Sequence, residues 1–524
     1  MISEYLDKAR KIAASMTLEQ KIGQMIMASI EVTEMNDKTR MFLKENCIGN
    51  IILFGKNCVN RKQLVNLNRQ IQDEVTSYTG GIQALLSIDQ EGGIVTRIRN
   101  GATVFSCAAA VGAAGKPEYA YRMGKIMGEE LRSLGISYNL APVLDTDGSR
   151  TGKTPNRRSF GATPEITSLY GGAYARGLRE SGVIDTGKHF PGSGDSPVDT
   201  HFGTSVVHTS KDEAMEISVK AFKKVIDEGM RSLMIDHTCY TGLDPACIPA
   251  SISKPIIQEL ARETLGFEGL IISDGMQMLA IEDVYGAPRG CVLAAEAGCD
   301  LLIVGNGGDN ADPDGKDVQT PCIKALIDAA RSGELSISRV DESATRIIAF
   351  KLMLGDLYPV KDAETLDWRE HEQFSRMLAA SGVKVQKNER NLLPIPSGAL
   401  FLSRKSRARL GVEEGDKLIE GFAPMAAKHL NGTSAEFDEK PDLDSLKDKI
   451  ICAPSVVFAC ASRYELHSLT EDIKAVCALN PNTCLVCQDV PESVESIDFA
   501  PLVITSYDQT INAIRSVIDV LKGK

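Results

Sequence analysis

The chain has 524 residues, which is more than one ordinary hydrophobic core accommodates, and so indicates two or more domains. Its 58 Lys and Arg against 70 Asp and Glu give a formal net charge of −12. That excess of acid argues against nucleic acid or an anionic membrane as the main partner. A hydrophobic content of 43% and a charged content of 24% are ordinary for a soluble globular protein.

The first 20 residues carry charges throughout and lack the apolar stretch of a secretory signal. No apolar run is as long as the about 18 residues that a membrane-spanning helix needs. Thirteen scattered cysteines fit free thiols, so we expect a cytoplasmic protein. The pair Cys484 and Cys487 has no second CxxC or His pair beside it, and we therefore expect no metal and no cofactor.

Short apolar segments alternate with amphipathic ones through the first two-thirds of the chain. This alternation predicts parallel strands joined by helices, and eight such units favour a (β/α)8 barrel. A doubly wound open sheet is the alternative, but no glycine-rich dinucleotide turn follows the first segment. The predicted strands are Gln24–Ser29, Gly49–Phe54, Gln83–Ile88, Ile136–Pro142, Val183–Lys188, Arg231–Ile235, Gly269–Ile272 and Asp300–Val304, and the predicted helices include Pro117–Ser133, Pro164–Glu180, Lys211–Glu228 and Lys254–Leu265.

Polar residues cluster where these predicted strands end. In a parallel barrel all such positions meet at one end, so they predict a site there. The residues concerned are Asp89, Asp145, Lys188, His189, Asp236, His237, Asp274 and Asn306.

A second domain is predicted to follow. We expect a catalytic barrel over residues 1–354, a polar linker over 355–369 and a C-terminal α/β sandwich over 370–524. The linker holds Pro359 and the only tryptophan, Trp368. Predicted strands of the sandwich are Ala399–Leu402, Ile450–Ala453 with Val456–Ala461, Thr483–Cys487 and Pro501–Thr505, and Ile511–Leu521 is a predicted final helix.

The segment from Lys188 to His201 is the richest in chemistry. It contains a Lys-His pair, a Gly/Pro-rich loop, and Asp199 two residues before His201. In an extended chain these two side chains point to the same side, so the carboxylate can orient the imidazole and leave its other nitrogen free for proton transfer. An isolated Asp-x-His can equally be a solvated loop or a structural hydrogen bond.

The whole string KHFPGSGDSPVDTH resembles the signature of family 3 glycoside hydrolases of the β-N-acetylglucosaminidase branch. This resemblance implies that His201 is the acid/base and Asp199 its partner. The string IISDGMQM, residues 271–278, is similar to the nucleophile segment of the same family and implies that Asp274 is the nucleophile. Without the resemblance, Asp274 could equally cap the following helix.

Two further strings carry the resemblance. Ser87–Gly93 (SIDQEGG) with Arg97 is similar to the family's D-QEGG segment, and Arg158–Gly161 (RSFG) to its R-SFG segment. Each of these residues could instead belong to a buried ion-pair network that stabilises the barrel. The resemblance implies substrate binding by Asp89, Arg97, Arg158, Lys188 and His189.

The resemblance implies a retaining, metal-independent exo-β-N-acetylglucosaminidase. It would release terminal N-acetylglucosamine from small glycosides, such as peptidoglycan-recycling muropeptides or chitin fragments, through a covalent glycosyl-aspartate. One alternative is a phosphorylase, because a neutral His201 would not repel an incoming phosphate. The sequence also leaves open a β-glucosidase and a catalytically inactive sugar-binding protein.

Overall fold

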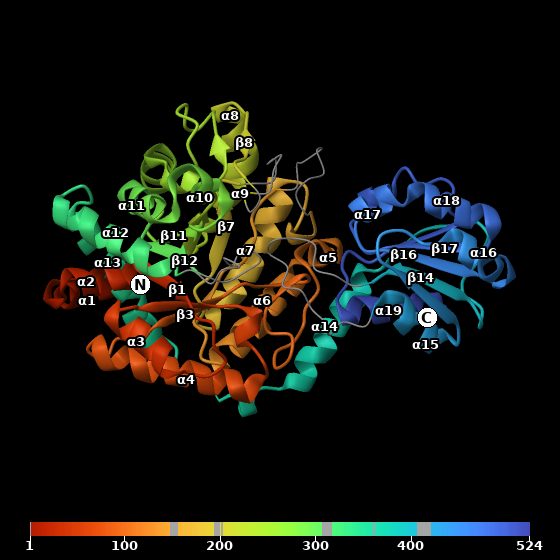
Figure 1. Ribbon diagram of the computed structural model, residues 1–524, viewed down its shortest axis with the longest axis horizontal. Coiled ribbons are helices and arrows are strands. Elements are labelled where there is room, and N and C mark those ends of the chain that lie inside the picture. Colours follow the sequence, from red (N-terminus) through yellow and green to blue (C-terminus); the bar gives the residue numbers. More distant parts are fainter. Residues whose placement is uncertain are drawn as a thin grey trace.

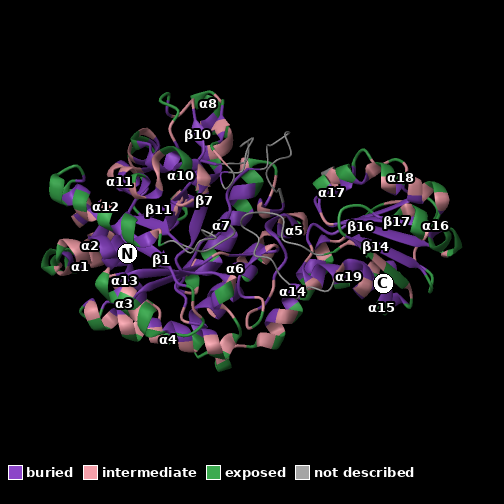
Figure 2. Ribbon diagram, viewed as in Figure 1, coloured by how far each residue is buried: buried purple, intermediate pink, exposed green. Residues whose placement is uncertain are grey.

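The structure is a computed structural model that describes residues 2–146, 156–192, 200, 203–305, 317–359, 362–405 and 421–524. Figure 1 shows a larger unit that contains the N-terminus and a smaller unit, in blue, that contains the C-terminus. Each unit is built around its own sheet, and the residues of both sheets are largely buried (Figure 2).

The larger unit is the expected barrel. Its eight strands pair in parallel in the order β6-β3-β2-β1-β12-β11-β9-β7. Bridges between Tyr138 and Ile184 and between Val143 and Lys188 connect the two outermost strands and nearly close the sheet. The strands are β1 (Ile26–Ser29), β2 (Asn50–Leu53), β3 (Leu85–Ile88), β6 (Tyr138–Asn139), β7 (Thr186–Phe190), β9 (Ser232–Ile235), β11 (Leu270–Gly275) and β12 (Leu301–Val304).

Helices surround these strands (Figure 1). The helices over 117–133 and 164–180 have the predicted bounds. Each begins at a proline, Pro117 or Pro164, because the first turn of a helix tolerates a residue without a backbone N–H. The predicted helix over 211–228 is observed as α8 (Lys211–Ala214), η3 (Met215–Val219) and α9 (Lys220–Asp227). The helices of this unit include α2 (Leu18–Met25), α4 (Arg61–Tyr78), α6 (Pro117–Ser133), α7 (Pro164–Glu180), η5 (Pro255–Thr264), α10 (Leu279–Tyr285), α11 (Ala287–Ala297), α12 (Gln319–Ser332) and α13 (Ile337–Leu357).

The smaller unit is an α/β sandwich. Its strands lie in the order β13-β18-β17-β16-β14-β15, all parallel to their neighbours except β13. Alternate residues of one strand enter different cores: Phe401 packs with helices α15 and α19, whereas Leu400 and Leu402 pack with α16 and α18. The elements are β13 (Lys384–Asn388), β14 (Leu400–Arg404), β15 (Thr433–Phe437), β16 (Val456–Cys460), β17 (Thr483–Cys487), β18 (Leu502–Thr505), α15 (Phe422–Leu430), α16 (Leu443–Cys452), α18 (Thr470–Leu479) and α19 (Ile511–Leu521).

The prediction of a strand over Ile450–Ala453 is wrong, because residues 450–452 end helix α16. Leu443, Leu446 and Ile450 recur at helical spacing and face the core, while the adjacent Ile451 is 51% exposed. Strands β13 and β15 lie at the two sheet edges, where few of their residues are buried. Their sequences consequently lack the apolar runs that identify the central strands.

Helix α14 (Trp368–Gly382) joins the two units (Figure 1). His371 Nδ1 lies 2.8 Å from Glu130 Oε1 of α6, and Ser375 Oγ donates to Val104 O at 2.6 Å. From the other side, Asn512 of α19 donates to Ser375 Oγ at 3.1 Å. The described part of the predicted linker, 355–369, contains the end of α13, the turn η6 (Ala363–Thr365) and the start of α14. The domain bounds themselves stay a prediction.

No helix within the described ranges is long and apolar enough to cross a membrane.

A buried ion cluster closes the end of the barrel where the strands begin. Asp300, directly before β12, is fully buried. Its Oδ2 accepts from Arg262 at 2.7 Å, and its Oδ1 accepts from Arg339 at 2.7 Å and from Arg346 at 2.5 Å. Burial raises the pKa of Asp300, but the three guanidinium groups outweigh it and hold that pKa well below its usual range.

Asp300→Asn should therefore destabilise the barrel by about 3–5 kcal/mol, because it leaves Arg262 without an anion and leaves Arg339 and Arg346 with only the half-exposed Glu342. Urea unfolding followed by circular dichroism measures this change. Glu296→Gln is the matched control, since its pair with Lys254 is exposed and should contribute about 0–1 kcal/mol. Equal losses in the two variants would contradict the assigned role of Asp300.

Candidate active site

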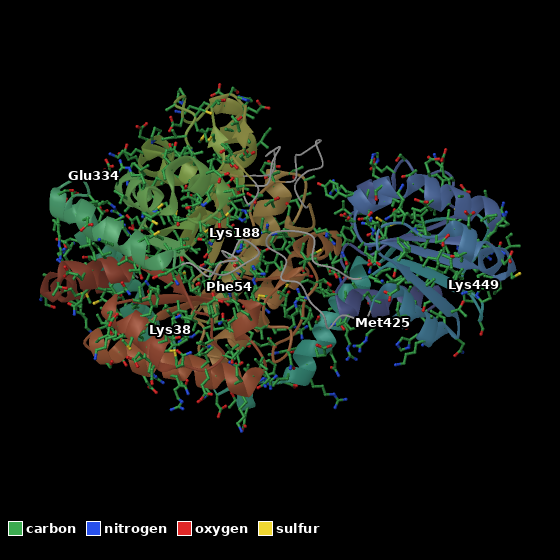
Figure 3. All side chains as sticks on the ribbon, in the orientation of Figure 1. Lys38, Phe54, Lys188, Glu334, Met425 and Lys449 are labelled. Carbon is green, nitrogen blue, oxygen red and sulfur yellow. The ribbon has the colours of Figure 1, made fainter. Side chains whose placement is uncertain are left out.

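Lys188 of β7 is the centre of a charged network at the opposite end of the barrel, where the strands finish. Its side chain is 2% exposed, and its Nζ lies 2.6 Å from Asp89 Oδ1 and 2.6 Å from Glu91 Oε1. Figure 3 places Lys188 in the middle of the barrel, away from the peripheral Lys38 and Glu334. Burial lowers the pKa of Lys188, but the two carboxylates outweigh it and raise that pKa above its ordinary value. Lys188 is therefore a fixed cation.

Arg158, from the turn η2 (Asn156–Arg158), completes the neutralisation of Glu91. Its Nε and Nη2 donate to the two oxygens of Glu91 at 2.9 and 2.8 Å. Burial raises the pKa of Glu91, but Arg158 and Lys188 reverse the effect and hold it well below its usual range. Two bonds in a fork fix the plane of the guanidinium as well as its position.

Asp89 follows β3 and contacts two cations. One oxygen binds Lys188, and the other lies 3.6 Å from Nη2 of Arg97. Arg97 is 6% exposed, whereas the Asp89 side chain is 15% exposed. Asp89 therefore combines a fixed position with a surface that a ligand can reach.

His189 is held by Asp145. The backbone N–H of His189 donates to Asp145 Oδ1 at 3.0 Å, and ring Nδ1 lies 2.7 Å from Oδ2. Burial lowers the pKa of His189, but the Asp145 carboxylate outweighs it and raises that pKa above 6.5. Ring Nε2 lies 3.5 Å from Nη2 of Arg158, which links this pair to the network around Lys188.

Asp274 lies near the end of β11, at the same end of the barrel as Asp89, since both strands are parallel. It is partly exposed, and its Oδ1 accepts from the N–H of Gly275 at 2.7 Å. The fully buried His237 supports this strand end: its Nε2 lies 3.0 Å from Gly275 O, and its Nδ1 lies 2.7 Å from Ser251 Oγ. Because a carbonyl can only accept, Nε2 of His237 carries a proton.

Asp236 directly follows β9, the strand next to β11. Its Oδ1 accepts from the N–H of His237 at 2.7 Å, and its Oδ2 from Tyr240 Oη at 2.9 Å. Burial raises the pKa of Asp236 above its ordinary value. Asp236 and His237 are thus satisfied by protein groups and position the backbone next to Asp274.

Two glycines connect the site to the smaller unit. Gly92 and Gly93 have φ of 101° and 61°, and a Cβ on them would lie 2.6 Å from Ser106 O and 2.5 Å from Cys107 Cβ. Only glycine allows this turn and this close approach. Cys107 N–H in turn donates to Asp508 Oδ2 of the smaller unit at 3.0 Å.

The arginine next to Arg158 makes a second connection. Arg157 is buried, and its Nη1 donates to Ala461 O at 3.2 Å in the smaller unit. Adjacent residues of one short turn therefore contact the second sheet on one side and Glu91 on the other.

The structure thus brings Asp89, Arg97, Arg158, Lys188 and His189 into one network, and Asp274 to the same barrel end. Asp199, His201 and Asn306 lie outside the described residues. Thr200, between Asp199 and His201 in the chain, is described, and its carbonyl accepts from Ala280 N at 3.4 Å, six residues after Asp274.

The sequence analysis assigned no role to Glu91, and it placed Asp145 at the site without assigning it as the partner of His189. Glu91 lies in the same SIDQEGG string as Asp89, and Asp145 lies at a predicted strand end. Their positions in the sequence were therefore the feature that could have indicated them as site residues. Within the described part of the chain, no three His, Cys, Asp or Glu residues are grouped so as to hold a metal ion.

Residues 17–350 match the model of the glycosyl hydrolase family 3 N-terminal domain, and the chain belongs to that family. It is a glycoside hydrolase. The beta-hexosaminidase of Hydrogenovibrio crunogenus is 32% identical over 303 residues, which are 55% of this chain and 82% of the relative. That of Stenotrophomonas maltophilia is 30% identical over 286 residues, 53% of this chain and 83% of the relative. A solved family 3 β-N-acetylglucosaminidase from Paenibacillus sp. FPU-7 superposes with a TM-score of 0.88 at 28% identity, covering 97% of both chains.

Asp145→Asn should lower the pKa of His189 below 6.5, because burial then acts without the opposing carboxylate. Titration of ¹³C-labelled histidine by NMR measures this, and the spectrum of His189→Gln assigns the resonance. An unchanged His189 titration would show that Asp145 is not its electrostatic partner.

Proposed function

We propose that this protein is an exo-acting, retaining β-N-acetylglucosaminidase that hydrolyses terminal non-reducing N-acetylglucosamine from small glycosides. The observation that carries the proposal is the position of Asp274, partly exposed at the same barrel end as the Lys188 network. Support comes from the beta-hexosaminidase relatives and from the Paenibacillus β-N-acetylglucosaminidase, whose whole length this chain covers almost completely.

Asp274 is proposed as the nucleophile. A carboxylate beneath the anomeric carbon forms a glycosyl ester and stabilises the positive charge of the oxocarbenium-like transition state. Its backbone is held by β11 and by the bond of His237 to Gly275 O, so the attacking oxygen has a defined position. Preorganisation of this kind reduces the entropy lost when the reacting atoms meet.

His201 is proposed as the acid/base and Asp199 as the residue that orients it. The acid protonates the leaving oxygen, and the same nitrogen then takes a proton from the attacking water. Support comes from the resemblance of the loop and from Thr200, which bonds to Ala280 at the start of α10, just after the Asp274 segment.

Asp89, Arg97, Arg158, Lys188 and His189 are proposed to bind the sugar. Asp89 offers acceptor oxygens, and Arg158 and His189 have side chains 14% and 13% exposed from which N–H groups can donate to hydroxyls. Lys188 is buried, so its main effect on the sugar is indirect: its ammonium group bridges Asp89 and Glu91 and holds both carboxylates at fixed positions.

Small muropeptide or chitin fragments in the cytoplasm are the proposed substrates. No disulfide joins any cysteines among the described residues, which fits a reducing compartment. Water is the proposed acceptor of the sugar.

Asp274→Ala should lose turnover by on the order of 10⁴-fold while remaining folded, because no covalent intermediate can form. The measurement is release of nitrophenol from its β-N-acetylglucosaminide, with the sugar product identified with and without added phosphate. Asp283→Ala, on the exposed face of α10, is the matched control and should retain full activity. Full activity of Asp274→Ala would refute the role of Asp274 as the nucleophile. A sugar 1-phosphate produced in the presence of phosphate would show that the reaction is phosphorolysis and not hydrolysis.

His201→Ala should slow cleavage of a substrate with a poor leaving group far more than that of an activated nitrophenyl glycoside, because only the poor leaving group needs a proton. Rates of both substrates in the wild type, in His201→Ala and in His208→Ala measure this. His208 is exposed, and its replacement should leave the ratio unchanged. Equal slowing of both substrates in His201→Ala would make His201 a binding residue.

A further inference from the structure

A cavity of about 300 Å³ lies at the end of the barrel away from Asp274. Its lining comes from residues that precede strands or begin them, such as Ala84, Leu85 and Ser137, and from α4, α6 and α13. Val65 and Gln83 in the lining are exposed, so the cavity communicates with solvent. Since a water takes about 30 Å³ in the liquid, the space fits a molecule of roughly ten non-hydrogen atoms.

Two buried cations line this cavity. Arg132, in the last turn of α6, is 7% exposed, and Lys351 of α13 is 6% exposed. Lys351 Nζ donates to Gln24 Oε1 at 2.6 Å and to Gly49 O at 2.9 Å. Arg132 Nη2 donates to the carbonyl of Tyr358. All of these acceptors are neutral.

Several partly buried arginines at this end are paired with carboxylates. Arg262, Arg339 and Arg346 share Asp300, and Arg179 binds Asp185 at 2.8 Å. For Arg132 and Lys351, no salt bridge exists within the ranges that the structure describes. Two cations in a poorly solvated place without an anion are costly, because neutral hydrogen bonds do not cancel net charge.

Unused polar atoms also line the cavity. Nε of Arg132 is buried and has no hydrogen-bond partner among the described residues, and the same holds for Oδ1 of Asn68. The remaining lining is largely apolar, with Leu85, Leu134 and Leu354. A ligand that fits would bring an oxygen anion for the cations and a small organic body for the rest.

We propose that this cavity binds a small organic oxyanion, whose negative group lies between Arg132 and Lys351. The site is separate from the catalytic end, because its residues lie where the strands begin, and the opposite strand ends carry Asp89 and Asp274. It follows from unpaired charge and available volume, and is independent of the proposed glycosidase activity.

The protonation of Lys351 gives the proposal a pH dependence. Burial lowers the pKa of Lys351 to about 7. The charged residues lining the cavity with it are Arg69 of α4 and Arg132 of α6, and on its other side Gln24 and Gly49 do not titrate. An anion needs the charged amine, so affinity should fall as the pH rises above about 7.

Without ligand, the lowered pKa of Lys351 also determines how the stability of the fold changes with pH. Between pH 7 and the ordinary lysine value the unfolded chain holds a proton that the folded chain lacks, so stability rises with pH across that window. Lys351→Met should remove this rise.

The test is thermal unfolding of the full chain at pH 6.5 and constant ionic strength, titrated with lactate, butyrate or inorganic phosphate. The wild type should show saturable stabilisation by at least one of these anions. Lys351→Met should weaken that binding by about tenfold or more, since a charged hydrogen bond is lost. Val65→Glu, which places a carboxylate in the cavity from an exposed position, should weaken it also and does not depend on the fold tolerating a buried change.

Lys324→Met, on the exposed face of α12, is the matched control and should respond like the wild type. The three anions distinguish an organic carboxylate from a free phosphate as the preferred ligand. Absence of saturable stabilisation in the wild type would overturn the proposal. So would an undiminished response in Val65→Glu and Lys351→Met, since that would show that the anion binds outside this cavity.

Discussion

The ammonium group of Lys188 is the constraint on which the catalytic end of the barrel depends. It lies 2.6 Å from Asp89 and 2.6 Å from Glu91 in a place that water hardly reaches. Buried ion pairs rarely stabilise a fold more than well-packed apolar residues would, yet removing one partner is strongly destabilising. We infer that the network is retained for geometry: Glu91 orients Arg158, Arg158 approaches His189, and Asp89 is left partly exposed at a fixed position.

The two ends of the barrel handle charge in different ways. At the end where strands begin, Asp300 is enclosed by three arginines and serves the fold. At the end where strands finish, side chains of Asp89, Asp145, Arg158 and His189 stay 12–15% exposed, which gives a ligand access. The smaller unit reaches that end through Arg157 and through the contact of Cys107 with Asp508, so the position of Arg158 depends on both units.

Much of this architecture was predictable because its signals are local. Most strands of the barrel are short, buried, mostly apolar segments, and the prolines at the first turns of α6 and α7 fix where those helices start. Sequence patterns did not predict the edge strands β13 and β15 or the end of α16, because solvent exposure and tertiary packing determine these elements. Strand-end positions likewise indicated Asp89, Lys188 and Asp274. The hydrogen bonds between Arg158 and Glu91 join residues 67 positions apart in the chain, and the contact between His189 and Asp145 joins residues 44 positions apart. No local sequence pattern specifies such long-range pairs.

The central claim is that Asp274 is the nucleophile at the barrel end built around Lys188. A 5-fluoro glycosyl fluoride of N-acetylglucosamine should form its ester faster than the ester is hydrolysed, so that the adduct accumulates. Intact-mass measurement followed by peptide sequencing locates it. The account predicts one adduct per chain, on Asp274, and none in Asp274→Ala. An adduct on Asp89, Glu91 or any other carboxylate would contradict it.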